Sequence, residues 1–106
     1  MMTVINNDLT QVDELLAHRE TMRVTRHALF EAHKESLRDT DIFHAIFNGH
    51  ILEHYPQRRR VLIVGPSARF DLQIHVVCDY TDRDEILAVT VYIPDRPRWA
   101  SDSMRA

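Results

Sequence analysis

The chain has 106 residues, of which 44% are apolar and 27% charged, with two glycines and four prolines. This composition is typical of one globular domain and excludes a disordered or low-complexity protein. The formal net charge of −3 is not the basic excess of a general nucleic-acid binder. The sequence contains no signal-peptide pattern and no apolar run long enough to span a membrane, so we expect a cytoplasmic protein without membrane contact.

The N-terminal part of the chain has the apolar spacing of a helix. The predicted helix covers Asn7–Glu20, and its apolar side consists of Leu9, Val12, Leu15 and Leu16. The segment Thr21–Val24 that follows is either a short strand or an extended linker. We expect residues 1–20 to form a helical extension, residues 21–100 a single α+β domain and residues 101–106 a tail.

Two further helices are predicted before the middle of the chain. Thr25 is a suitable cap for a helix that runs to about Glu35, and Asp39 or Thr40 opens the next one. Gly49 follows this third helix at the position where a left-handed C-cap is expected.

The second half of the chain changes to the period of strands. The four predicted strands are His50–Tyr55, Arg60–Val64, Leu72–Tyr80 and Glu85–Ile93. Gly65 and Pro66 break the second strand, and Pro94 and Pro97 stop the last one, because proline cannot donate to a strand ladder. Helices followed by strands indicate an α+β fold, with two or three helices packed on one face of a mainly antiparallel four-stranded meander sheet.

The last two strands predict a specific arrangement of side chains. If a hairpin forms across residues 81–84, the facing pairs are Tyr80–Glu85, Val77–Ala88, His75–Thr90 and Gln73–Tyr92. One face is then apolar and packs on the helices; it comprises Leu72, Ile74, Val76, Cys78, Tyr80, Leu87, Val89, Val91 and Ile93. The opposite face carries His75 and Tyr92, on the side that the helices leave uncovered. A slip of one residue would reverse the two faces of a strand.

Five segments of the chain carry a family resemblance: VTRHA (24–28), TDIFHAIFNGHILEHYP (40–56), RVLIVG (60–65), IHVVCDY (74–80) and ILAVTVYIPDRPRW (86–99). Together they resemble the bacterial domain-of-unknown-function family 4258, and residues 1–20 lie outside the resemblance. The resemblance implies a small α+β domain similar in plan to RelE- and BrnT-like toxins. Such toxins are nucleases that act on mRNA, with or without the ribosome, and are paired with an antitoxin. The implied partners are therefore an antitoxin protein and RNA or the ribosome.

Three residues are candidates for catalysis. His75 could act as general base or acid when an RNA 2′-hydroxyl attacks its phosphate, since this step needs a group that titrates near neutrality. Tyr92 could donate a proton or stack on a base. His27 lies at a helix start, where the helix dipole favours the neutral base, and the resembling motif includes it. The structural alternatives are a His75–Thr90 polar pair exposed on the sheet and a His27 that orders its loop.

Four arginines are candidates for binding RNA phosphates. Arg58, Arg59 and Arg60 are clustered in a predicted hairpin turn, and Arg69 lies in the next loop. The alternative is that these charges are only solvated. Trp99 in the tail could stack on a base or cap the edge of the core.

The sequence predicts neither a metal site nor a cofactor. His50 and His54 are expected on one strand face, but no carboxylate partner and no zinc motif accompany them. Cys78 is the one cysteine, and we expect it to be a small buried hydrophobe.

Two functional hypotheses remain. The leading one is a toxin-like component of a bacterial toxin–antitoxin module that acts as a metal-independent ribonuclease. The alternative is a non-enzymatic protein-interaction module, in which Leu9, Val12, Leu15 and Leu16 pack on another chain. Sheet edges also allow strand addition, either by a second copy in a homodimer or by an antitoxin.

Overall fold

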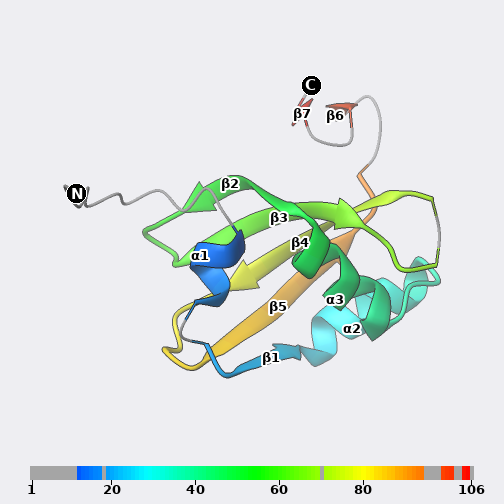
Figure 1. The fold of residues 1–106 in the computed structure, drawn as a ribbon. Coiled ribbons are helices and arrows are strands. Elements are labelled where there is room, and N and C mark those ends of the chain that lie inside the picture. Colours follow the sequence, from blue (N-terminus) through cyan, green and yellow to red (C-terminus); the bar gives the residue numbers. More distant parts are fainter. Residues whose placement is uncertain (1–11, 18, 70, 95–98, 102–103, 106) are drawn as a thin grey trace.

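In the computed structural model, the structure describes residues 12–17, 19–69, 71–94, 99–101 and 104–105. Its elements are α1 (Val12–Leu16), β1 (Thr21–Val24), α2 (Arg26–Lys34), α3 (Asp39–Asn48), β2 (His50–Tyr55), β3 (Arg60–Pro66), β4 (Gln73–Asp79), β5 (Glu85–Tyr92), β6 (Trp99–Ser101) and β7 (Met104–Arg105) (Figure 1). The predicted start of the first helix at Asn7 and the side chain of Trp99 lie outside what the structure describes. None of the helices in the described ranges is long and apolar enough to cross a membrane.

The α+β class is confirmed, but the main sheet has five strands rather than four. Its order is β1-β5-β4-β3-β2, and β1 runs parallel to β5 with Thr21 opposite Glu85 and Val24 opposite Ala88. The sheet is therefore mixed, with β2 to β5 as an antiparallel meander. The sequence left Thr21–Val24 open because four residues are too few to show a period. Pairing with the exposed edge of β5 decides its structure.

The predicted helix starts are largely confirmed. The hydroxyl of Thr25 accepts a hydrogen bond from the amide of Ala28 at 3.2 Å and caps α2. At the start of α3, the carboxylate of Asp41 accepts a hydrogen bond from the amide of Arg38 at 2.9 Å. Each cap satisfies one of the amides that a helix start leaves without a partner inside the helix.

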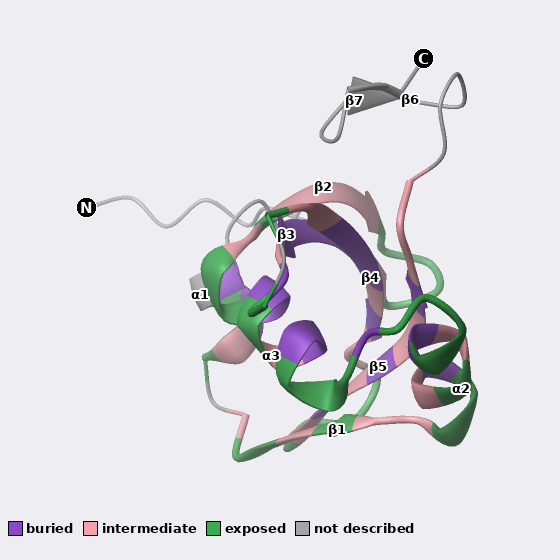
Figure 2. Ribbon diagram, turned by 90° about the vertical axis from the view of Figure 1, so that its right-hand side faces the viewer, coloured by how far each residue is buried: buried purple, intermediate pink, exposed green. Residues whose placement is uncertain are grey.

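Helix α3 lies in the hollow of the curved sheet (Figure 2). The core between them contains Ile42, Ala45 and Ile46 of α3 and the inward residues of the sheet, which are Val61, Ile63, Ile74, Val76, Cys78, Ile86, Ala88 and Val91. Val12 and Leu15 of α1 belong to the same core cluster. The hypothesis that these two residues pack on another chain is therefore wrong, because this chain already buries them.

Both glycines of the chain lie where α3 passes close to the sheet. A β-carbon on Gly65 would lie 2.0 Å from the carbonyl oxygen of Ala45, and one on Gly49 would lie 2.4 Å from the same atom. Gly49 does not form the predicted left-handed cap, since its φ of −101° is an ordinary extended value. Close backbone contact, not a special turn, requires glycine at both positions. Strand β3 also continues through Gly65 to Pro66 instead of ending before them.

A β-bulge in β5 changes the predicted face of that strand. Val77 pairs with Thr90 and Cys78 pairs with Ala88, which leaves Val89 as the extra residue. The core therefore contains Ile86, Ala88 and Val91 of β5. The prediction was right for Val91 and wrong for Leu87 and Val89, because an inserted residue shifts the side-chain alternation by one position.

Candidate functional site

The site lies on the face of the sheet opposite α3, called here the outer face. It consists of Arg60, Leu62, Val64, His75, Val77, Asp79, Thr90 and Tyr92, which occupy the positions between or beside the core residues along β3, β4 and β5. Leu62, Val64 and His75 are buried, and the other five are half-buried. The prediction that His75 and Tyr92 share a face away from the helices is confirmed.

His75 and Tyr92 face each other directly across β4 and β5. The Nδ1 atom of His75 lies 3.3 Å from the hydroxyl oxygen of Tyr92, and the ring centroids are 5.2 Å apart. The predicted pairs Val77–Ala88, His75–Thr90 and Gln73–Tyr92 are wrong. The hairpin starts one residue out of the predicted register, with Asp79 opposite Leu87, and the bulge at Val89 adds a second residue. His75 is also fully buried, so the expected exposed polar pair does not form. Tyr92 is half-buried.

A cleft of about 790 Å³ opens beside this pair. Val77 and Thr90 line the cleft and are paired across β4 and β5. This pair lies two residues along the strands from the His75–Tyr92 pair, on the same face, so the two pairs are roughly 7 Å apart. The remaining lining residues come from β2, the β2–β3 turn and the start of β3; they are His54, Tyr55, Pro56, Gln57, Arg58 and Arg60. The cleft therefore combines two of the predicted arginines with a surface that continues to Tyr92.

The three clustered arginines have different surroundings. Arg60 forms an ion pair with Asp79 at 2.9 Å, which neutralises much of its charge. Burial raises the pKa of Asp79, but hydrogen bonds from Thr81 and Arg60 outweigh it and hold that pKa below its ordinary value. Arg58 is exposed and forms no ion pair with any residue that the structure describes. Arg58 is thus the available cation at the cleft.

Arg59 turns the chain rather than lining the cleft. Its φ of 54° is in the left-handed region, which is uncommon for a residue with a side chain. Its carbonyl oxygen accepts a hydrogen bond from the amide of Tyr80 at 2.9 Å, which ties the β2–β3 turn to the end of β4. The side chain itself is on the exposed surface.

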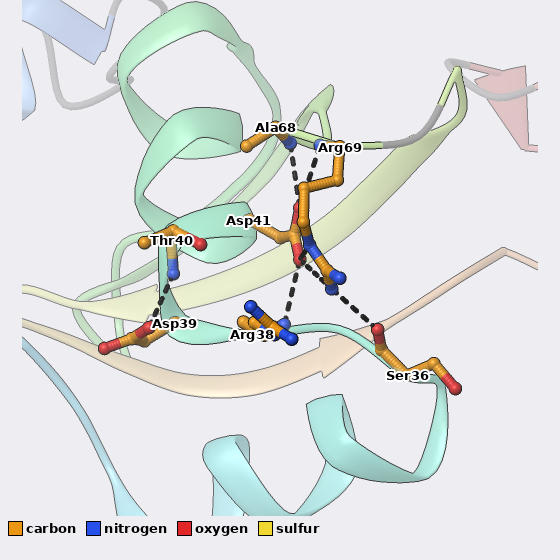
Figure 3. A network of polar contacts seen from close by, with 7 residues as sticks. All are labelled: Ser36, Arg38, Asp39, Thr40, Asp41, Ala68 and Arg69. Atoms are coloured by element: carbon orange, nitrogen blue, oxygen red, sulfur yellow. Dashed lines mark hydrogen bonds and ion pairs between the residues drawn. The ribbon is translucent and has the colours of Figure 1, made fainter.

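Arg69 is bound to another part of the molecule, at the start of α3 (Figure 3). Its Nε and Nη2 atoms lie 3.2 and 2.9 Å from a carboxylate oxygen of the buried Asp41, and Nη2 also donates to the carbonyl of Ser36 at 2.8 Å. The other carboxylate oxygen of Asp41 accepts from the amides of Ala68 and Arg69. The structure therefore places the Arg69 guanidinium in a network that fixes its loop and does not bring it to the cleft.

His27 is on the exposed side of α2, with 69% of its side chain accessible. Its Nε2 atom lies 3.4 Å from Oε2 of Glu31, and Oε1 of Glu31 accepts a hydrogen bond from the amide of Val91 at 3.2 Å. Val91 precedes Tyr92 in β5, so Glu31 links His27 to the strand that carries the tyrosine. The sequence did not predict this role of Glu31, since no local pattern shows which strand amide lacks a ladder partner.

A second histidine–tyrosine pair lies on the helix side of the sheet. Nε2 of His54 is 2.6 Å from the hydroxyl of Tyr80, and Arg19 donates to the carbonyl of Tyr80 at 2.9 Å. Burial raises the pKa of Tyr80, although Arg59 and Arg19 partly oppose this. The sequence placed Tyr80 on the core face but did not identify its partners, because they come from distant elements.

His50 and His54 are not on one face, contrary to the prediction. His50 pairs with Val64 of the outer face and His54 pairs with Val61 of the core face, because a bulge at Leu52 interrupts the alternation. Within the described ranges, no three residues of the types His, Cys, Asp and Glu are grouped closely enough to hold a metal ion. Tyr92 and His75, beside the cleft, are groups that can transfer a proton, and Arg58, which lines it, is a cation that can bind an anion.

Comparison with known proteins yields one family. A search of curated proteins and a search of solved structures each found no match. A family model described as "Domain of unknown function (DUF4258)" matches residues 24–93, which is most of the chain and includes β1's last residue through β5. It covers His27, the cleft residues and the His75–Tyr92 pair. The chain therefore belongs to the domain-of-unknown-function family 4258.

Proposed function

We propose that the chain is the toxin-like component of a bacterial toxin–antitoxin module and acts as a metal-independent ribonuclease. The observation that carries this proposal is the His75–Tyr92 contact beside a cleft that displays Arg58. A pair that can transfer a proton, on the same sheet face as a cation that can bind a neighbouring phosphate of the strand, suits cleavage of a phosphodiester.

The proposed reaction is attack of an RNA 2′-oxygen on the adjacent phosphorus. The new O2′–P bond forms while the P–O5′ bond breaks, which yields a 2′,3′-cyclic phosphate and a free 5′-hydroxyl. Tyr92 gives its phenolic proton to the departing 5′-oxygen. His75, in the tautomer with the proton on Nδ1, donates a hydrogen bond that stabilises the Tyr92 phenolate until it regains a proton from solvent. His75 thus acts through Tyr92, as its burial requires.

The remaining proton, on the 2′-hydroxyl, needs a second acceptor. We assign this supporting role to His27, which is exposed on α2 and is linked through Glu31 to the backbone of β5. Arg58 binds a neighbouring phosphate of the RNA strand, and Arg59 adds positive charge at the same turn. Arg60 positions the turn through its ion pair with Asp79.

A cleavage assay tests this function directly. The purified protein is incubated with single-stranded RNA in EDTA, with and without ribosomes, and the products are analysed for 2′,3′-cyclic phosphate ends. Cleavage by the wild type should be lost in Tyr92→Phe and strongly reduced in His75→Ala, after circular dichroism has verified that both variants are folded. Arg58→Gln should lower cleavage, whereas the matched control Arg83→Gln, in the exposed β4–β5 turn, should not. Equal cleavage by the wild type and both pair variants would remove the mechanism.

Among the described residues, β1 and β2 end the sheet, and the proposed antitoxin would add a strand at one of these two edges. An added strand along β2 would border the cleft at Tyr55, which suits an inhibitor of this site. Expression of the chain should arrest bacterial growth, and co-expression of the antitoxin should relieve the arrest.

A non-enzymatic interaction module is the second candidate. It is favoured by Phe30 and Phe47, each 61% exposed, because large apolar side chains on a helix surface are common in protein interfaces. If this candidate is right, Phe30→Ser and Phe47→Ser should abolish capture of a partner protein, and the wild type should leave RNA intact.

A further inference from the structure

We infer that the site binds single-stranded RNA and that Tyr55 is the platform on which one of its bases stacks. The inference rests on the proposed function and names its substrate class. Tyr55 is the last residue of β2, lines the cleft and is 38% exposed, which makes it one of three large apolar side chains on the described surface. An exposed aromatic ring at the mouth of a cleft is a site for base stacking.

The position of the Tyr55 ring is fixed by its neighbours. Its hydroxyl donates a hydrogen bond to a carboxylate oxygen of Glu53, two residues earlier on the same strand. Its carbonyl oxygen accepts a hydrogen bond from the amide of Arg58 at 3.1 Å, which closes the turn and brings the arginine beside the tyrosine. The chain thus presents a ring and a cation together, and a nucleotide offers the matching base and phosphate.

The length of the surface also fits a nucleic-acid strand. Tyr55 on β2 and Tyr92 on β5 are three strand spacings apart across the sheet, roughly 14 Å, and four residues apart along the strands, roughly 13 Å. Stacked nucleotides rise by about 3.4 Å along a strand, so this surface spans several of them. A base at Tyr55 would then lie a few nucleotides from the phosphate at Tyr92.

Stacking on a side chain selects single strands. In an RNA duplex the bases are stacked on one another and their edges are in grooves, whereas an unpaired base is free to stack on an aromatic ring. Because Arg58 is the available cation at the cleft, contacts with phosphates contribute little to the binding free energy. Base stacking therefore supplies a large share of the affinity. Binding should therefore weaken only slightly with salt, with a slope near −0.7 for each phosphate contact.

Binding is tested with RNA that cannot be cleaved. The probe is a fluorescent 2′-O-methyl oligoribonucleotide of mixed sequence, used as a single strand, as a duplex with its complement and as a fully abasic strand. Fluorescence anisotropy in EDTA measures the affinity of the full chain. We expect Tyr55→Leu to weaken binding of the single strand by about 5- to 150-fold, the range of one lost base stack.

Three controls separate stacking from other effects. Tyr55→Phe keeps the ring and should stay within about twofold of the wild type. Phe47→Leu removes an exposed ring from α3, outside the residues that line this cleft, and should change nothing. Tyr55→Leu should bind the abasic strand with the same affinity as the wild type. Arg58→Gln should weaken binding of both the ordinary single strand and the abasic strand, and should reduce the salt slope by about 0.7.

The outcomes distinguish this inference from the proposed function. The inference would be overturned if Tyr55→Leu bound the single strand with unchanged affinity, or if the wild type bound the duplex as tightly as the single strand. Neither result would decide the proposed ribonuclease activity, which the cleavage assay tests separately. Binding that depends on Tyr55, without any cleavage of natural RNA, would support the inference and contradict the proposed ribonuclease activity. A wild type that binds none of the three probes would remove both.

Discussion

Nδ1 of His75 and the hydroxyl of Tyr92 lie 3.3 Å apart because the two residues are directly paired across β4 and β5. The contact joins a fully buried imidazole to a half-buried phenol. Removing the hydroxyl takes one hydrogen-bond partner from a buried group. Tyr92→Phe should therefore lower the free energy of unfolding by about 0.5–1.5 kcal/mol, measured by urea denaturation. A loss of more than about 3 kcal/mol would show that Tyr92 is chiefly a structural residue.

Gly65 is predicted to be intolerant of any side chain. A β-carbon there would lie 2.0 Å from the carbonyl oxygen of Ala45, and the obstacle is helix backbone that cannot rotate away. Gly65→Ala should destabilise the fold by about 1–3 kcal/mol or more, measured as a shift of the urea midpoint. Arg83→Ala, in the exposed β4–β5 turn, serves as a substitution control. A stability of Gly65→Ala equal to that of the wild type would contradict the close helix–sheet contact.

Asp41 should make stability depend on acid pH. Burial raises the pKa of its carboxyl, but the amides of Arg38, Ala68 and Arg69 and the Arg69 guanidinium together hold that pKa below its ordinary value. The unfolded carboxyl titrates near pH 3.9, so between that pH and the lower folded pKa the unfolded state binds more protons. The stabilisation is complete above about pH 4 and is lost as the pH falls through the folded pKa.

Asp41→Asn should remove this pH dependence and lower stability at pH 7 by about 3–5 kcal/mol, since it leaves the Arg69 guanidinium without its carboxylate. Unfolding curves between pH 2 and pH 7 measure both effects. A matched substitution of an exposed acid, Asp82→Asn in the β4–β5 turn, should leave the pH profile nearly unchanged. Parallel profiles for the wild type and Asp41→Asn would show that the carboxylate network contributes nothing.

Leu15 tests whether α1 belongs to the core of its own chain. It is fully buried in the cluster that also contains Ile42 and Ala45. Leu15→Ala should cost about 2–5 kcal/mol of unfolding free energy, and deletion of residues 1–19 should unfold the domain. Leu29→Ala on α2, which is only half-buried, should cost less. If the truncated chain stayed folded and only lost self-association, α1 would be an interface helix after all.

Cys78 should be chemically silent in the native protein. Burial, with a smaller contribution from Asp79, raises the pKa of its thiol to about 12. The reactive thiolate is therefore nearly absent at pH 8, and the reagent has no access to the sulfur. Labelling by a thiol-specific reagent should proceed only as fast as the chain unfolds, and urea should accelerate it. Rapid stoichiometric labelling without denaturant would show that this part of β4 is open.

The sequence alone predicted the elements that have a strong local signal. The limits of β2 match the prediction, the start of α2 follows from the capping residue Thr25, and α3 begins at the predicted Asp39. The shared face of His75 and Tyr92 also followed from alternation along the two strands. These features depend on neighbouring residues, whose spacing and capping chemistry are visible in the chain itself.

Only the tertiary structure decided the features that depend on distant segments. The bulges at Leu52 and Val89 changed which residues face each other, and the pairing of β1 with β5 joined segments about sixty residues apart. The same holds for Arg69, which the sequence placed with the phosphate-binding arginines and which the fold joins to Asp41. A β-bulge or a long-range ion pair is stabilised by contacts that form only after the chain has folded back on itself. The local periodicity of the sequence therefore predicts neither.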